Sequence, residues 1–94
     1  MNQEFDWDEA KAIANLQKHK VSFEEAKTVF GDPFALTITD PDHSIEEFRF
    51  LNLGESSTGK FLIVSYTQRN RQIRIISCRK ATVAERKMYE ENYS

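Results

Sequence analysis

Two arginines, Arg74 and Arg79, lie within and at the end of the apolar run IRIISCR, which is typical of a β-strand. A guanidinium held on a strand can grip a phosphate with two nitrogens at once. Residues 1–47 carry four Lys/Arg against eleven Asp/Glu, whereas residues 60–94 carry eight Lys/Arg against three Glu. An acidic end and a structured basic end predict a face for nucleic acid or phosphate. An ordinary solvated charged surface is the alternative.

The composition indicates one domain spanning residues 1–94 and excludes several classes of protein. The chain is 39% hydrophobic and has a formal net charge of −2. No apolar run is long enough to cross a membrane, so no membrane association is expected. The single Cys78 cannot form an intramolecular disulfide, which predicts a reduced, cytoplasmic setting. His19 and His43 are the only histidines and lie on different predicted elements, so no metal site and no cofactor are expected.

The elements that must position the arginines form an α+β domain: two N-terminal helices, a four-stranded, mainly antiparallel sheet and a C-terminal helix. Ser22 with Glu25 and Thr82 with Glu85 have the spacing of capping boxes. Connections of hairpin length favour antiparallel pairing, with the helices packed on one face. Residues 5–7 alternate briefly, as a short edge strand would. The predicted elements are helices at residues 9–19, 23–30 and 82–89, and strands at residues 35–39, 46–53, 60–66 and 73–79.

Two segments resemble the signature of the BrnT family: WDEAKAIANLQKHKVSFEEAKTVFGDP near the start and RIISCRKATVAERKMY near the end. The resemblance runs from Phe5 to about Tyr89. It departs from the family at Lys20, where Gly is frequent and a left-handed conformation is expected, and at Cys78, where a small Ala is usual.

This resemblance implies a RelE-like ribonuclease toxin of a type II toxin–antitoxin module that cuts RNA to halt translation. It also implies a BrnA-like ribbon-helix-helix antitoxin as the partner. The heteromeric complex, which can contain a toxin homodimer, would bind operator DNA only through the antitoxin.

RNA cleavage without a metal needs a base for the 2′-OH, cations for the transition-state charge and an acid for the leaving oxygen. Arg79 is the first candidate for phosphate contact, with an ion pair to Glu85 as the alternative. Arg74 either faces a functional cleft or pairs with a carboxylate. The odd spacing of the two arginines places them on opposite sheet faces, unless a bulge or twist near Ser77 intervenes or the chain already turns at Arg79. Arg49, on the preceding strand, can join them or lie at the surface.

Three further residues are candidates for the acid and the base. Tyr66 ends a predicted strand and can act as acid, base or stacking platform, or as a core tyrosine with its hydroxyl at the rim. His19 titrates near neutral pH, and Lys18 precedes it. Both also suit the last turn of a helix, where basic groups complement the dipole.

The expected function is therefore that of a metal-independent ribonuclease toxin held inactive by an antitoxin. The alternative is a non-catalytic binding or corepressor module. The net negative charge favours this alternative, and so does the spacing that places Arg74 and Arg79 on opposite faces of the sheet. A phosphate-binding enzyme of another kind is disfavoured because the chain has no Gly-rich phosphate loop. The acidic N-terminal helices are either a solvated face or part of the surface where an antitoxin with basic groups docks.

Overall fold

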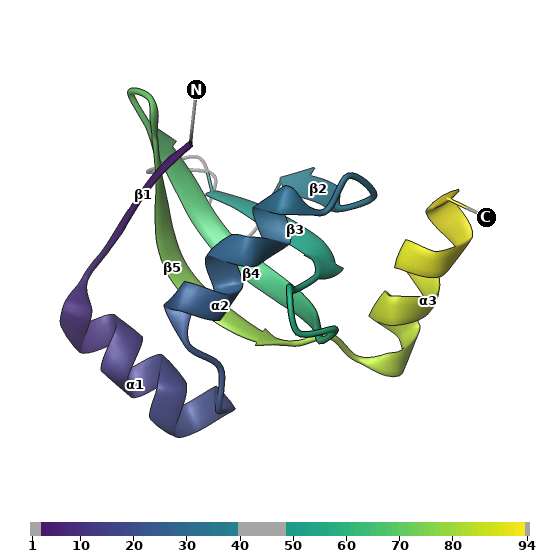
Figure 1. Ribbon diagram of the computed structural model, residues 1–94, viewed down its shortest axis with the longest axis horizontal. Helices are drawn as coiled ribbons and strands as arrows, with labels where there is room; N and C mark the ends of the chain where they lie inside the picture. The colour runs from purple at the N-terminus through teal and green to yellow at the C-terminus, as the bar shows by residue number, and fades with distance from the viewer. Residues whose placement is uncertain (1–2, 40–48, 94) are drawn as a thin grey trace.

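A computed structural model describes residues 3–39 and 49–93, which fold into an α+β arrangement of one sheet and three α-helices (Figure 1). The elements in chain order are β1 (Glu4–Trp7), α1 (Glu9–His19), α2 (Phe23–Thr28), the 3₁₀ turn η1 (Val29–Gly31), β2 (Leu36–Thr39), β3 (Arg49–Glu55), β4 (Phe61–Arg69), β5 (Gln72–Lys80) and α3 (Val83–Tyr93). The α+β class is thus confirmed. His43 and residues 46–48 of one predicted strand lie outside the described residues.

The sheet has five strands in the order β1-β5-β4-β3-β2, and it is mixed. The prediction of a four-stranded, mainly antiparallel sheet is corrected on this point. Strands β2 to β5 pair antiparallel, but β1 adds to β5 in parallel, with Asp6 opposite Arg74. This pairing joins residues 68 positions apart, so hairpin-length connections could not reveal it.

A bulge in β5 decides which residues share a face. Ser77 pairs with Ser65 and Ile75 pairs with Tyr66, so Ile76 has no partner in β4. Such an extra residue reverses the alternation of side chains along the strand. Accordingly, Ile75 before the bulge and Cys78 after it belong to the same hydrophobic cluster.

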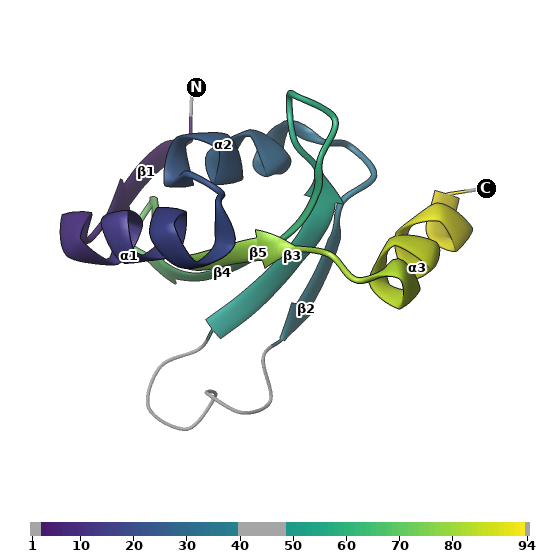
Figure 2. The same ribbon diagram turned by 90° about the horizontal axis from the view of Figure 1, so that it is seen from below.

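Helices α1 and α2 cover one face of the sheet (Figure 2), which is called the helix face below. Asn15 of α1 is buried there. Its side chain hydrogen-bonds the backbone of β5 at Cys78, beyond Ile75, where the pairing with β1 ends. Its side-chain amide donates to the carbonyls of Val21 and Cys78, at 3.0 and 2.9 Å, and its oxygen accepts from the Cys78 N–H at 3.0 Å. The fully or nearly buried residues of this face are Val21, Phe23, Ala26, Val29, Leu62, Val64, Tyr66, Ile73, Ile75 and Cys78.

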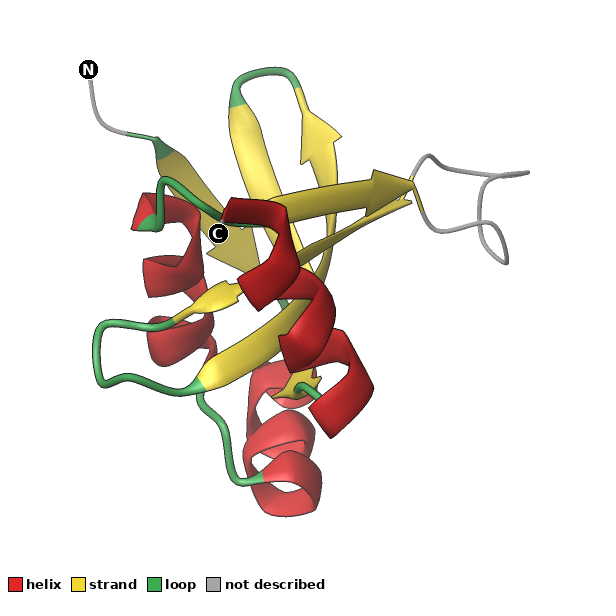
Figure 3. Ribbon diagram, turned by 90° about the vertical axis from the view of Figure 1, so that its right-hand side faces the viewer, coloured by secondary structure: helices red, strands yellow, loops and turns green. Residues whose placement is uncertain are grey.

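Among the described residues, only α3 covers the opposite face, called the open face below, and it packs at one end (Figures 1 and 3). The expectation that all the helices pack on one face is therefore wrong, since α3 lies on the other side of the sheet from α1 and α2. Tyr89 of α3 is buried against Leu53 and Ile63. Its hydroxyl donates a 2.7 Å hydrogen bond to Asp32, which ties α3 to the turn before β2. The C-terminal helix is longer than predicted, since it continues past Tyr89 to Tyr93.

The helix ends follow the predicted chemistry. Ser22 accepts from the Glu25 N–H at 3.0 Å, and Thr82 and Glu85 form a reciprocal capping box. Lys20 ends α1 in the left-handed conformation, with φ 62°, as expected at a position where Gly is usual.

Candidate nucleic-acid face

The three candidate arginines lie on the open face. Arg49 of β3 and Arg74 of β5 both pair with Thr67 of β4, so they form one row across three strands. Adjacent strands are about 4.8 Å apart, which separates the two Cα atoms by roughly 10 Å. Arg79 pairs with Ile63, whose side chain contacts α3, so it shares this face. The bulge that a shared face required is present at Ile76.

Arg74 is held by an acidic side chain from the neighbouring strand. Its Nη1 donates to both carboxylate oxygens of Asp6 at 2.9 Å. Both side chains are about one-third exposed, at 31% and 35%. The pair therefore lies at the surface of the open face, where an anionic ligand can compete with Asp6 for the guanidinium.

Arg79 is paired in a similar way. Its two terminal nitrogens donate to the two oxygens of Glu85 at 2.8 Å each. This pairing and the hydrogen bond from the Thr82 N–H lower the pKa of Glu85 to about 2, against an opposing effect of burial. An ion pair with Glu85 was the predicted alternative role of Arg79, and this ion pair is formed. The Arg79 side chain nevertheless remains 42% exposed.

Arg49 is half-buried at the start of β3. Within residues 3–39 and 49–93, no carboxylate forms an ion pair with it. Of the three arginines it is the one whose charge the acidic side chains of these residues leave uncompensated.

Tyr66 lies on the other side of the sheet from the arginines. It is buried on the helix face, with ring centroids 4.9 Å from Phe30 and 5.5 Å from Phe50. Burial raises the pKa of Tyr66, although a hydrogen bond with Thr37 opposes this effect. Tyr66 is therefore a core tyrosine, which was the alternative to a catalytic or stacking role. A catalytic role for Tyr66 stays a prediction, and the sheet separates this residue from the three arginines.

His19 and Lys18 form the last turn of α1, which packs over the helix face. His19 is half-buried and Lys18 is exposed. The sheet separates them from the row of Arg49 and Arg74, so the structure does not bring the predicted base to the predicted phosphate site. Their role as catalytic residues likewise stays a prediction.

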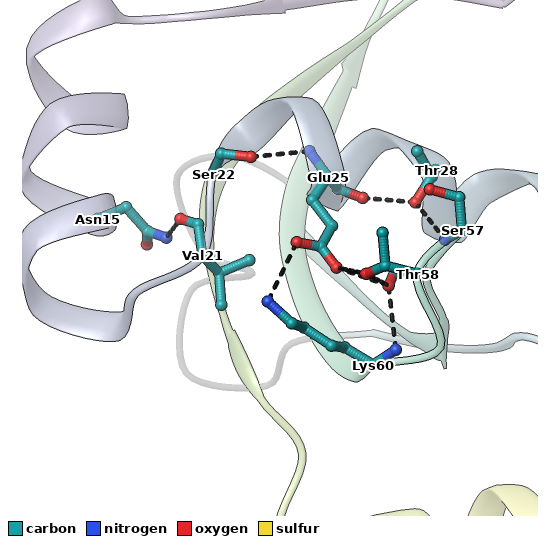
Figure 4. Close-up of polar contacts among 9 residues, drawn as sticks. Asn15, Val21, Ser22, Glu25, Thr28, Ser57, Thr58 and Lys60 are labelled. Atoms are coloured by element: carbon teal, nitrogen blue, oxygen red, sulfur yellow. Dashed lines mark hydrogen bonds and ion pairs between the residues drawn. The ribbon is translucent and has the colours of Figure 1, made fainter.

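A polar cluster around Glu25 joins α2 to the turn between β3 and β4 (Figure 4). The carboxylate accepts hydrogen bonds from the hydroxyls of Ser56, at 2.8 Å, and of Thr58, and it forms a 3.5 Å ion pair with Lys60. The Thr58 hydrogen bond is the largest cause that lowers the pKa of Glu25, and burial opposes it. The cluster fastens the turn to the helix, which is a structural role.

Asp32 is a junction that sequence reasoning missed. It accepts from the backbone N–H groups of Phe34 and Glu55, both at 2.9 Å, and from the Tyr89 hydroxyl. Burial alone would raise the pKa of Asp32, but these hydrogen bonds outweigh it and lower the pKa. Gly54 leaves room beside it, since a Cβ there would come within 3.1 Å of the Asp32 carboxylate. Asp32 therefore positions α3 over one end of the open face.

Asp6 is the missed residue nearest the candidate site. Its place between Phe5 and Trp7, which both pack toward the core, was the available signal. Only the parallel pairing of β1 with β5 shows that this carboxylate meets Arg74.

The part of the chain that the structure describes contains no cluster of three or more His, Cys, Asp or Glu side chains that could hold a metal ion. Burial raises the pKa of the Cys78 thiol to about 12, so this cysteine is an inert core residue. None of the described helices is long and apolar enough to span a bilayer.

Comparison with known proteins identifies the class to which this fold and this arginine-bearing face belong. The model of the family described as "Ribonuclease toxin, BrnT, of type II toxin-antitoxin system" matches residues 7–85. The chain thus falls within the ribonuclease toxins of type II toxin–antitoxin systems. It belongs to the BrnT family, which confirms the resemblance drawn from the two sequence segments.

The fold agrees with a solved member of that class. The crystal structure of the Brucella abortus ribonuclease toxin BrnT superposes with a TM-score of 0.65 at 22% sequence identity. The alignment covers 86% of this chain and 99% of the Brucella chain. No curated protein gives a significant match by sequence.

Proposed function

We propose that this BrnT-family toxin binds RNA across its open face and cleaves it by metal-independent, RelE-like acid–base chemistry that inhibits translation. The observation that carries this proposal is the placement of Arg49, Arg74 and Arg79 on one face. Guanidinium groups fixed on strands can bind the phosphate and stabilise the charge that develops on it in the transition state. The products would carry a 2′,3′-cyclic phosphate or a 3′-phosphate and a 5′-hydroxyl.

RNA binding in this proposal is an exchange of anions. Asp6 and Glu85 hold Arg74 and Arg79 in position while the face is empty. A phosphate offers the same two-oxygen geometry and takes the place of one carboxylate. The displaced carboxylate of Asp6 would then lie beside the scissile phosphate, where it could accept the 2′-OH proton. The 2′-oxygen would form the new bond to phosphorus, the bond from phosphorus to the 5′-oxygen would break, and the 5′-oxygen would leave with a proton from solvent water.

The partner in this proposal is a BrnA-like ribbon-helix-helix antitoxin, and operator DNA is contacted only through it. The family description places the chain in a type II toxin–antitoxin system, which supports an antitoxin partner.

The test is cleavage of end-labelled RNA by the purified chain in excess EDTA, with analysis of the new ends. Arg49→Ala and Arg74→Ala should each slow cleavage on the order of a hundredfold, because each removes a cation from the transition state. Lys11→Ala, at an exposed position of α1 on the other side of the sheet, is the matched control and should leave the rate unchanged. Abolition by EDTA with rescue by magnesium would contradict the proposed chemistry.

A non-catalytic binding module is the second candidate. Two observations favour it: Arg74 and Arg79 are each paired with a carboxylate, and His19 lies on the helix face. Normal growth and intact RNA during high soluble expression of the chain alone would support this candidate over the nuclease.

A further inference from the structure

Helix α1 turns part of its apolar surface outward. Its side toward the sheet carries the buried Asn15, whereas Ile13 and Leu16 are 54% and 49% exposed. An amphipathic helix in a small domain normally buries residues of this kind. Large apolar side chains that stay half-exposed beside one another are typical of an interaction surface.

These side chains line a groove of about 210 Å³ between α1 and the start of α2. Its lining includes the apolar side chains of Trp7, Ile13, Leu16 and Phe23. It also includes the two exposed acidic residues Glu9 and Glu24, which are called its rim below. The volume lies below the range of about 300–1,000 Å³ typical of small-molecule pockets, so apolar side chains of a partner fit it better than a cofactor.

The rim carries negative charge. Glu9 forms no ion pair with any residue in the ranges 3–39 and 49–93, and Glu24 is exposed and contacts only Lys27, at 3.1 Å, by an ion pair. A second copy of this chain would bring its own acidic rim against this one, which is repulsive. A segment with apolar residues on one side and Lys or Arg beside them is complementary to both the groove and the rim.

We propose that this groove is the docking site of the antitoxin, which inserts the apolar side of a basic amphipathic helix between α1 and α2. The groove residues Glu9, Ala12, Ile13 and Leu16 follow the spacing of one helix face, and such a stripe receives a second helix in helix-in-groove recognition. The proposal rests on the proposed toxin function, because it takes the partner to be the antitoxin.

The sheet lies between this groove and the arginines of the open face. The antitoxin would therefore be held by a surface that RNA does not use, and neutralisation would come from parts of the antitoxin that reach around the sheet edge or from the assembly it forms. Binding of the antitoxin and cleavage of RNA can then be separated by substitution.

The experiment measures the affinity of the antitoxin encoded with this chain, by calorimetry, for Ile13→Asp and Leu16→Asp. Ala14→Asp, on the exposed side of the same helix, is the matched control because it adds the same charge. We expect each groove variant to weaken binding on the order of 10- to 100-fold, as loss of a central apolar anchor does. The control should bind as the unsubstituted chain does, and all three variants should cleave free RNA at the original rate.

Two further measurements keep the result decisive if a groove variant unfolds. The double variant Glu9→Gln/Glu24→Gln changes only exposed rim residues, and it should weaken binding and flatten its dependence on salt. Trp7 is the one tryptophan of the chain and lines the groove, so its emission should shift to shorter wavelength when antitoxin binds.

Unchanged affinity of the groove variants that stay folded, or unchanged affinity and salt dependence of the double variant, would overturn the proposal. Self-association of the chain alone that Ile13→Asp abolishes would do the same, because it assigns the groove to a second copy. Absence of RNA cleavage by every form of the protein would instead refute the proposed nuclease function, while the binding result would still stand.

Discussion

The ion pair between Arg79 and Glu85 can be broken from either side, and the two substitutions have different consequences if Arg79 contacts RNA. Arg79→Ala removes the pair and the cation together. Glu85→Gln removes the pair but leaves the cation free on the open face. It also preserves the capping box, because the Gln side chain can still accept from the Thr82 N–H.

The two effects differ in size. The pair is bidentate at 2.8 Å but partly exposed, so its loss should cost about 1 kcal/mol of unfolding free energy in either variant. For a domain of this size, that corresponds to a fall in the thermal midpoint of roughly 4–8 °C. Removing a group that stabilises transition-state charge costs on the order of a hundredfold in rate, or about 2.7 kcal/mol.

The assay combines thermal unfolding with single-turnover cleavage of end-labelled RNA. Both variants should lose similar stability, yet only Arg79→Ala should lose activity, and Glu85→Gln should keep or exceed the original rate. Full activity of Arg79→Ala would show that the site is misplaced. Equal loss of activity in both variants, in step with unfolding, would show that the pair is a fold element only.

Three other outcomes are expected from the Asp6–Arg74 pair, from the carboxyl group of Glu85 and from the end of α1. Asp6→Asn should bind a non-cleavable 2′-O-methyl RNA more tightly in fluorescence anisotropy, because Arg74 no longer has a competing carboxylate; unchanged affinity would remove Arg74 from the binding face. The pKa of Glu85 falls from 4.5 to about 2 on folding, so its contribution to stability is present above pH 4.5 and is lost as the pH falls toward 2. Denaturant titrations over this range should show a shallower acid loss for Glu85→Gln than for the unsubstituted chain. Lys20→Gly should raise the unfolding free energy by about 1 kcal/mol, since Gly adopts the left-handed conformation without strain; a lower thermal midpoint would contradict this account of the α1 end.

Short-range features of the chain were accessible to sequence reasoning because they depend on neighbouring residues. The caps at Ser22 and Thr82 were predicted from spacing, and the left-handed end of α1 was predicted from Lys20 at a position where Gly is usual. Alternating apolar residues located β4 and β5 to within a few positions. The two sequence segments also determined the family, which the match over residues 7–85 confirms.

The composition of the candidate face was decided by tertiary structure. Strict alternation placed Arg74 and Arg79 on opposite faces, and one unpaired residue, Ile76, brings them to the same face. A bulge exists only in the register between two strands, so the residues of β5 alone do not specify it. The partner of Arg74 is likewise Asp6, from a strand 68 positions away that pairs in parallel. Local periodicity carries information about which side of a strand a residue occupies, but long-range pairing decides what lies opposite it.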